Sequence, residues 1–403
     1  MPWQRRPFTS SRIERALNIG HLREIARRRV PHFAFEYVEG GAEDEVSLKG
    51  NRSAFEAYRF VPNTLVDTMN RHQRTELFGR EISTPLVIAP TGMNGILRYQ
   101  GDLLLARAAA RARIPFCLST VSTMRLETVA EQAGGRLWMQ LYVMRDRKMA
   151  EAIVRRAHAA GYEALVFTTD ANVFGYREWD RRNYVAPGKP TFRNLLDMLR
   201  HPSWLTEVVL RHGMPAFVNF APFLPPEQAS AIGGSTIIPN MFGPSITWDD
   251  IHWLRSIWDR KLLIKGVLSV PDAERAASLG CDGVVLTNHG GRQLDCCVAP
   301  IDMVPDVARA VGGKMTIIVD SGFRRGNDVV KALALGADAV MLGRATLYGL
   351  AAAGEQGVTR ALEILTGEID RTLGHLGVNS VKELGPHLLR TVAPPTREVE
   401  PVT

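Results

Sequence analysis

Short apolar runs rich in β-branched residues recur along the chain, and a stretch with helical periodicity follows most of them. Several runs are apolar without alternation, which is typical of parallel strands covered on both faces. Helical stretches at 271–279 and 328–335 lie between runs. The runs occupy residues 85–89, 115–119, 137–142, 164–169, 262–265, 283–288, 316–320 and 339–343. This pattern predicts an α/β fold, a (β/α)8 TIM barrel closed by eight βα units.

Two parts of the chain depart from the regular spacing. Residues 1–60 carry a helical pattern ahead of the predicted barrel, and about 90 residues separate the fourth run from the fifth, far more than a βα unit needs. The long interval predicts an insertion at about 178–250, on the face where barrels carry their active sites. We therefore expect a single domain over residues 1–403, with an N-terminal helical region and an insertion after the fourth strand.

The centre of this insertion has an unusual composition. Residues 181–223 hold six Lys or Arg against two acidic residues, together with many large apolar side chains. Such a mixture indicates an interface. Two interpretations stay open, namely a lid that packs only on its own barrel and a surface that contacts a membrane or a quinone.

The overall composition is that of a globular protein, because 45% of the 403 residues are hydrophobic and 23% are charged. The formal net charge of +7 is concentrated in the insertion and in residues 1–29, where eight Arg stand against two acidic residues. This basic start is interpreted either as a solvated leading helix or as an organelle transit peptide. No nucleic-acid-binding motif accompanies the charge, so we expect no nucleic-acid partner.

The four cysteines show neither metal-ligand spacing nor a disulfide framework, so we expect no metal site and a reducing compartment. No apolar run approaches the roughly 20 residues that span a bilayer. Residues 1–12 lack the apolar core of a secretory signal. These features favour a cytoplasmic protein.

Polar residues stand at the carboxyl ends of the predicted strands, where the βα loops of a barrel gather. Burying such groups costs free energy unless a partner or a ligand compensates. Their convergence on one rim predicts a functional site, with ordinary solvent-facing loops as the alternative. The residues are Thr91, Ser119, Gln140, Tyr142, Thr168, Asp170, Lys265, Asn288, His289 and Asp320.

The loops after the seventh and eighth predicted strands combine glycine with arginine. They run from Asp320 to Gly326 and from Leu342 to Arg344. Glycine lets backbone N–H groups approach an anion, and arginine supplies a charged fork. Barrels often bind phosphate at these two loops, so we expect a phosphate group here.

The loop after the sixth strand, Thr287 to Asp295, places His289 beside two glycines and three positions before Arg292. Histidine removes protons near neutral pH, and arginine grips a carboxylate in a bidentate pair. Together they suit an acidic substrate that has a proton to lose.

At this point the motifs resemble a known family. Thr287 to Asp295, Asp320 to Gly326 and Tyr37 to Asp44 are similar to the FMN-dependent α-hydroxy-acid dehydrogenases and oxidases, and the resemblance runs from about Ile25 to Gly385. Within that family, the stretches at 320–326 and 343–350 look most like the (S)-mandelate branch.

The resemblance implies FMN across the barrel mouth. It places the flavin against backbone at 90–92 and against side chains of the strand ends, with the phosphate at the glycine and arginine loops. Lys265 matches the lysine that faces the flavin N1 and O2 edge, where a fixed ammonium stabilises the charge of reduction. The implied cofactor residues are Pro90, Thr91, Gly92, Ser119, Gln140, Thr168, Lys265, Thr287, Asp320, Gly322, Arg324, Gly343 and Arg344.

The resemblance also implies a substrate site. It assigns the substrate carboxylate to Arg177 and Arg292, further contacts to Tyr37 and Tyr142, the base to His289 and its partner to Asp170. Taken singly, each matched residue also has a structural interpretation, such as rim packing or helix capping. Whether the base removes the α-carbon proton or the hydroxyl proton stays open.

Departures from the family pattern bear on the substrate and the electron acceptor. Val121 stands where glycolate oxidase-like members carry Trp, which predicts a roomier pocket, and Phe174 offers an aromatic wall. The family carries either Gly or Ala at the position of Gly92, so this residue says little about whether the enzyme uses oxygen. Members of the mandelate branch associate with membranes through an insertion at this place, so residues 181–225 are expected to give peripheral contact with the inner face of the cytoplasmic membrane.

The sequence therefore predicts FMN-dependent oxidation of an aromatic, mandelate-like (S)-2-hydroxy acid to the 2-oxo acid. Electrons pass to a quinone or another respiratory acceptor, and the resemblance implies a homotetramer. The alternatives are an L-lactate dehydrogenase and an oxygen-using 2-hydroxy-acid oxidase. An FMN-dependent barrel isomerase is disfavoured because two arginines and His289 indicate a hydroxy-acid site. A flavin-binding protein without catalysis is disfavoured because the chain holds all four of His289, Arg292, Tyr142 and Lys265.

Overall fold

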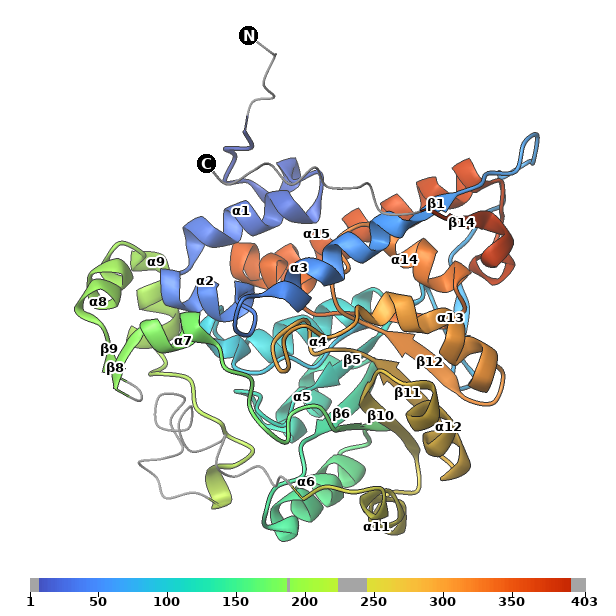
Figure 1. Cartoon of the computed structure of the whole chain (residues 1–403). Coiled ribbons are helices and arrows are strands. Elements are labelled where there is room, and N and C mark those ends of the chain that lie inside the picture. The colour runs from blue at the N-terminus through green and yellow to red at the C-terminus, as the bar shows by residue number, and fades with distance from the viewer. Residues whose placement is uncertain (1–6, 187–188, 224–244, 393–403) are drawn as a thin grey trace, which may run out of the picture.

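A closed parallel barrel forms the centre of the computed structural model, which describes residues 7–186, 189–223 and 245–392 (Figure 1). The strand order around it is β10, β11, β12, β13, β4, β5, β6 and β7, and neighbours pair in parallel. The strands are β4 (Leu86–Ile88), β5 (Pro115–Leu118), β6 (Arg136–Leu141), β7 (Ala164–Thr168), β10 (Lys261–Val267), β11 (Gly283–Leu286), β12 (Thr316–Val319) and β13 (Ala339–Leu342). All eight predicted runs are strands, and the predicted barrel is confirmed.

The alternation of side chains along each strand builds two apolar layers. In β4, Leu86 and Ile88 pack among the outer helices, whereas Val87 points into the barrel. A hairpin of β2 (Thr75–Leu77) and β3 (Arg80–Ile82) adds apolar side chains to the interior layer. It lies at the amino end of the barrel, where the Arg136 side chain at the start of β6 donates to carbonyls of both hairpin strands. The opposite end stays free for a site.

Helices surround the barrel as the βα pattern requires. α15 is broken at Ala353 and Gly354, whose backbone angles are not helical. The helices are α4 (Gly101–Arg111), α5 (Leu126–Ala133), α6 (Arg147–Ala159), α11 (Asp249–Ile257), α12 (Val270–Ser278), α13 (Pro300–Val311), α14 (Gly326–Ala334) and α15 (Arg344–Leu376).

The N-terminal region consists of α1 (Ile19–Arg29), α2 (His32–Glu39) and α3 (Val46–Ser53). α1 lies along α15 and buries Ile19, Leu22 and Ile25 (Figure 1). It is therefore a helix packed on its apolar side, while Arg27, Arg28 and Arg29 of its last turn are exposed. β1 (Tyr58–Phe60) follows and pairs antiparallel with β14 (Leu389–Thr391) near the other end of the chain.

The insertion after β7 has a buried and an exposed part. It contains α7 (Glu178–Arg182), β8 (Tyr184–Ala186), β9 (Lys189–Pro190), α8 (Phe192–Leu199), α9 (Pro202–Trp204), a π-helical turn (Leu205–Leu210) and a 3-10 turn (Ala221–Phe223). Two parts of the predicted insertion, residues 187–188 and 224–244, lie outside the described residues.

Packing divides the apolar side chains of the insertion into two sets. Trp204, Val208, Phe217 and Phe220 are buried against the barrel, as the lid interpretation predicts, whereas one face of α8 is exposed. The insertion thus has an apolar part buried against the rest of the chain and an apolar helix face that is exposed. Within the described ranges, no helix combines the length and the apolarity needed to cross a bilayer.

Candidate active site

A cavity opens at the carboxyl ends of the barrel strands, with about 1020 Å³ of space including its mouth. Most of the predicted site residues line it. They are Tyr37, Pro90, Thr91, Gly92, Ser119, Tyr142, Arg177, Lys265, His289, Arg292, Asp320, Gly322, Arg324, Gly343 and Arg344. The topology of the barrel therefore brings together residues that are up to about 300 positions apart, as its connection rules require.

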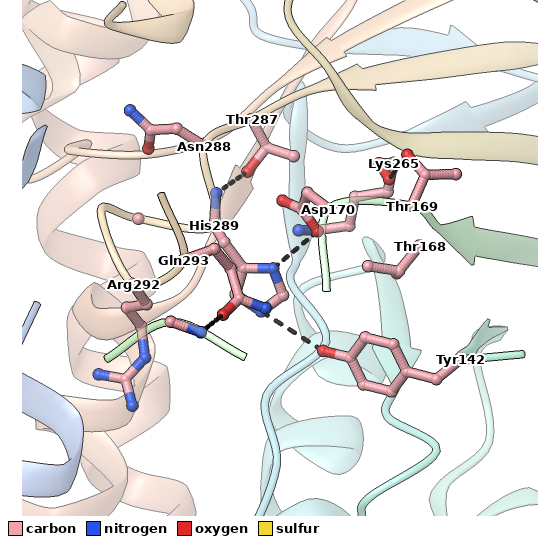
Figure 2. A network of polar contacts seen from close by, with 12 residues as sticks. Tyr142, Thr168, Thr169, Asp170, Lys265, Thr287, Asn288, His289, Arg292 and Gln293 are labelled. Atoms are coloured by element: carbon pink, nitrogen blue, oxygen red, sulfur yellow. Dashed lines mark hydrogen bonds and ion pairs between the residues drawn. The ribbon is translucent and has the colours of Figure 1, made fainter. Parts of the chain in front are cut away.

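His289 stands at the centre of a polar network (Figure 2). Its backbone is in the left-handed region with φ of 57°, and its N–H donates to the Thr287 hydroxyl at 2.9 Å. The imidazole Nδ1 lies 2.9 Å from Asp170 Oδ1, and Nε2 lies 3.4 Å from the Tyr142 hydroxyl. A carboxylate only accepts hydrogen bonds, so Nδ1 carries the proton of the neutral ring. The lone pair is then on Nε2, which makes this atom the basic one.

Burial and neighbouring charges tune this pair. Burial lowers the pKa of His289 below its usual value, Lys265 acts in the same direction, and Asp170 opposes both. Burial by itself raises the pKa of Asp170, but His289 and Lys265 outweigh it, so the pKa of that carboxyl lies below its usual value. At neutral pH the site therefore holds a neutral imidazole beside an ionised carboxylate, as a general base requires.

Lys265 and the strand ends form the floor of the cavity. Lys265 is buried, and its ammonium lies 3.6 Å from Asp320 Oδ2. Gln140 accepts from the Ser119 hydroxyl at 3.1 Å and donates to the Thr168 hydroxyl at 2.9 Å. These bonds fix the Gln140 amide. The arrangement presents one cation and several oriented polar groups that are buried, where charge interactions are stronger than in water.

Two arginines line the same cavity as His289. Arg292 donates to the Gly40 carbonyl at 2.7 Å and stacks over the Tyr37 ring at 5.3 Å. Arg177 donates to the Arg292 carbonyl at 3.2 Å and lies over the Phe174 ring at 5.8 Å. Two guanidinium groups held in this way suit a carboxylate ligand.

The glycine and arginine loops form the other end of the cavity. A Cβ at Gly322, where φ is 88°, would lie 2.2 Å from the Asn51 carbonyl oxygen, so only glycine fits. α15 begins directly after Gly343, which lines the cavity, and has no side-chain cap, and an uncapped helix N-terminus suits an anion. Among the described contacts, the Arg324 guanidinium donates one hydrogen bond, to the Phe323 carbonyl, and lies over the Tyr348 ring. This donor set fits the phosphate of FMN.

Arg344 has a structural task in addition to lining the cavity. Its guanidinium donates to the carbonyls of Val38, Gly40 and Gly290 at 2.8–2.9 Å. Burial, with Arg292 nearby, lowers the pKa of Arg344 to about 9, which leaves it charged at neutral pH. Arg344 therefore ties the end of α2 to the loop that carries the base.

The predicted site residues that do not line the cavity lie directly behind it. Asp170 and Thr287 contact His289, and Gln140 and Thr168 contact one another beneath Ser119. Asn288 was predicted at the rim, but it faces away from the cavity, because its amide exchanges two hydrogen bonds of 2.7–2.8 Å with Asn51. Further apolar and small residues line the cavity that were not predicted individually, although several lie inside the motifs that carried the resemblance. They are Val38, Ala89, Ser321, Phe323, Met341 and Leu347.

A second set of hydrogen bonds joins the loop after β11, which runs from Thr287 to Asp295 and is called the base loop, to the N-terminal region. Asp295 accepts from the N–H groups of Val46 and Ser47 at the start of α3, at 3.0 and 2.7 Å. The Ser47 hydroxyl in turn accepts from the N–H of Cys297. The loop after β11 is therefore anchored after His289 through Asp295 and before it through the hydrogen bonds of Asn288 with Asn51.

Comparison with known proteins gives consistent matches. The profile of the family described as FMN-dependent dehydrogenase matches residues 26–391. The chain is 46% identical over 374 residues to (S)-mandelate dehydrogenase of Pseudomonas putida, covering 93% of both chains. It is 41% identical to a putative L-lactate dehydrogenase of Mycobacterium tuberculosis, covering 93% of this chain and 89% of that one. A crystal structure of monotopic membrane protein (S)-mandelate dehydrogenase superposes with a TM-score of 0.89 at 44% identity, covering 94% of this chain and all of that chain.

Proposed function

Since the chain belongs to the FMN-dependent dehydrogenase family, whose members oxidise 2-hydroxy acids, we propose that its substrate is an aromatic (S)-2-hydroxy acid of the mandelate type. The product is the 2-oxo acid. The observation that supports this most is the placement of His289 between Asp170 and Tyr142, in a cavity that Arg177 and Arg292 also line.

Different residues of the cavity serve the substrate and the cofactor. Arg177 and Arg292 hold the substrate carboxylate, with Tyr37 beside them, and so fix the hydroxyl-bearing carbon. Lys265 and the strand ends at 90–92 and 119 face the cofactor, together with Gln140, Thr168 and Thr287 behind them. Asp320, Gly322, Arg324, Gly343 and Arg344 hold its ribityl and phosphate part. FMN, when bound, supplies the two-electron acceptor for the oxidation.

Proton removal is the task of His289. Nε2 carries the lone pair, so this atom takes the proton from the bound substrate. The imidazolium formed in this step donates through Nδ1 to Asp170, which stabilises it without becoming protonated. The Tyr142 hydroxyl, 3.4 Å from Nε2, is placed to contact the substrate hydroxyl. The same residues serve removal of the α-carbon proton and removal of the hydroxyl proton.

The preference for an aromatic acid rests on the cavity wall. Val121 and Phe174 line the cavity with apolar surface, and a small side chain such as Val121 leaves room. A phenyl group gains from apolar and aromatic contact there, whereas the methyl group of lactate leaves most of that surface uncovered. L-lactate dehydrogenase and 2-hydroxy-acid oxidase are the alternative activities.

The exposed face of α8 supports a membrane as the partner. Phe192, Leu195, Leu196 and Leu199 are 45–74% exposed and follow the helical spacing of one face. Arginines flank them in the same insertion. We include in the proposal that residues 181–225 contact the anionic inner face of the cytoplasmic membrane and that a membrane quinone reoxidises the enzyme.

Vesicle flotation tests the membrane contact. Replacing these four side chains with Ser should abolish flotation with vesicles that contain phosphatidylglycerol. The matched control replaces Leu65 and Met69, which are 100% and 87% exposed on a loop elsewhere, and should float as before. Equal flotation of both variants would refute the contact.

A homotetramer and a single domain complete the proposal. The apolar layer between barrel and helices runs without interruption from Ala16 in the N-terminal region to Leu388, which supports one domain over the chain. Sedimentation gives the number of subunits.

Anaerobic spectroscopy tests the reaction. The purified protein should be yellow, and (S)-mandelate should bleach it far faster than (R)-mandelate, lactate or glycolate. Reoxidation should be faster with a quinone analogue than with oxygen. Faster bleaching by lactate than by (S)-mandelate would refute the proposal of an aromatic substrate. Faster reoxidation by oxygen than by the quinone analogue would refute the proposal of a quinone acceptor.

A further inference from the structure

Two loops that line the cofactor side of the cavity touch one another. The loop after β4 contributes Thr91 and Gly92, and the loop after β5 contributes Ser119 and Val121. The Met93 N–H donates to the Val121 carbonyl at 3.1 Å, and a Cβ at Gly92 would lie 2.5 Å from Val121 Cγ2. Contact this close makes the surface sensitive to small shifts of either loop.

Asp102 lies behind both loops, in the first turn of α4, and is completely buried. Its Oδ1 accepts from Asn94 Nδ2 at 2.7 Å, and its Oδ2 accepts from the Thr123 N–H at 3.0 Å and the Thr123 hydroxyl at 2.9 Å. Within the described residues, no Lys, Arg or His forms an ion pair with it. Burial raises the pKa of Asp102, and these donors oppose that shift. A buried carboxylate without a cation is costly, so its hydrogen bonds must be retained.

Asn94 connects Asp102 to Thr91 through hydrogen bonds. The Asn94 amide belongs to the 3-10 turn Asn94–Ile96, and its Nδ2 donates both to Asp102 and to the Thr91 carbonyl at 3.0 Å. Its Oδ1 accepts from the Thr91 hydroxyl at 3.0 Å. Because a carboxylate only accepts, Asp102 fixes which end of the Asn94 amide faces it. Thr91 is thereby held at both its backbone and its side chain.

Thr123 connects the same carboxylate to the second loop. Its hydroxyl donates to Asp102 and accepts from the Gly95 N–H at 3.0 Å. The insertion meets this turn from the other side, since Trp204 Nε1 donates to the Ile96 carbonyl at 2.7 Å. Both loops thus depend on one buried carboxyl group that lies outside the cavity.

We propose that Asp102 is a positioning residue, which acts through Asn94 and Thr123 to hold the loops after β4 and β5 in register against the flavin. It touches neither substrate nor cofactor. The inference rests on the assignment of the cavity to FMN, but it is independent of which hydroxy acid is oxidised.

The variant Asp102→Asn keeps the shape of the side chain and removes one acceptor. An amide at 102 must direct its NH₂ either at Asn94 Nδ2 or at the Thr123 N–H, so one donor faces another in either orientation. In the first orientation the Asn94 amide has to turn, which leaves the Thr91 carbonyl without its donor; in the second, the Thr123 N–H loses its acceptor. We expect the flavin absorption maxima to shift and FMN to dissociate at least about tenfold more readily from the holoenzyme.

Further variants separate positioning from general stability. Asn94→Ala should reproduce the flavin effect, and the double variant with Asp102→Asn should be no worse than the more affected single variant. Thr123→Val should show the effect, whereas Thr123→Ser, which keeps the hydroxyl, should restore the parent spectrum. Asp250→Asn is the matched control, because Asp250 is equally buried but lies on α11.

The readouts are the flavin spectrum, the FMN dissociation constant and the midpoint potential, all measured without substrate. A failure of the aromatic-substrate proposal therefore leaves this test intact. If Asp102→Asn loses thermal stability like Asp250→Asn while all three flavin readouts stay unchanged, Asp102 is only structural and the inference is wrong. If Asp102→Asn does not fold, the Thr123 pair decides, and equal flavin properties of its Val and Ser variants would overturn the inference.

Discussion

The contact between Asp170 and His289 makes a quantitative prediction about proton removal. Replacing Asp170 by Asn keeps an oxygen that accepts from His289 Nδ1 but removes the negative charge. The pair is 2.9 Å apart and largely buried, with side-chain exposures of 15% and 19%. A hydrogen bond between charged groups in such a place is worth about 1.5–3 kcal/mol. Since about 1.4 kcal/mol corresponds to a factor of ten in rate, we expect proton removal to slow by about 10- to 150-fold.

The pH dependence carries a second, independent signature. Only the neutral imidazole removes a proton, so kcat/KM falls as the pH drops through the pKa of free His289. Asp170 raises that pKa against burial. Without its charge the pKa drops further, so the acid limb of the Asp170→Asn profile should move to lower pH while the plateau falls.

Anaerobic stopped-flow bleaching of the flavin from pH 5 to 9 measures both effects. FMN content and the melting temperature check that the variant is folded, and Asp250→Asn controls for the loss of a buried carboxylate elsewhere. A plateau within threefold of the parent enzyme, or an acid limb that stays in place, would refute the role of Asp170 as the partner of the base.

Three other changes are informative. His289→Ala should retain bound FMN, because the cofactor contacts lie elsewhere in the cavity, and should abolish bleaching by substrate; normal bleaching would exclude it as the base. Arg292→Lys loses the planar fork, so KM should rise about tenfold or more with a smaller change in kcat, measured by steady-state kinetics. Gly322→Ala should lower the melting temperature and weaken FMN binding more than Gly313→Ala, because both have positive φ but only Gly322 lies against the Asn51 carbonyl. Equal losses in the two glycine variants would show that backbone strain alone is responsible.

The barrel was predictable because its signal is local. A strand such as β4, apolar on both faces, has few alternatives in a chain with regular βα spacing. Strand ends were less certain. β10 continues to Val267, two residues beyond the predicted run, because the ladder passes a bulge near Gly266, where φ is 118° and glycine interrupts the apolar pattern.

The functional site was only partly predictable from local sequence. The residue types at strand ends indicated a base and an anion site, but the partnership of His289 with Asp170, 119 residues apart, followed only from family resemblance. Asn288 misled because a polar residue beside a base suggests the cavity, whereas its amide pairs with Asn51. Asp102 gave no signal, since an acid in the first turn of a helix is ordinarily an exposed partner of the helix dipole.

The ties between the N-terminal region and the base loop set an order for assembly during synthesis. Asn51 bonds Asn288 across 237 residues, and Arg344 bonds Val38 across 306. Contacts of such sequence separation close late, because the intervening chain must first be made and ordered. When β4 to β7 leave the ribosome, the arginine that joins Gly40 to Gly290 does not yet exist. A nascent chain therefore completes its cofactor pocket only after Arg344 has been made and has joined the N-terminal region to the loop after β11.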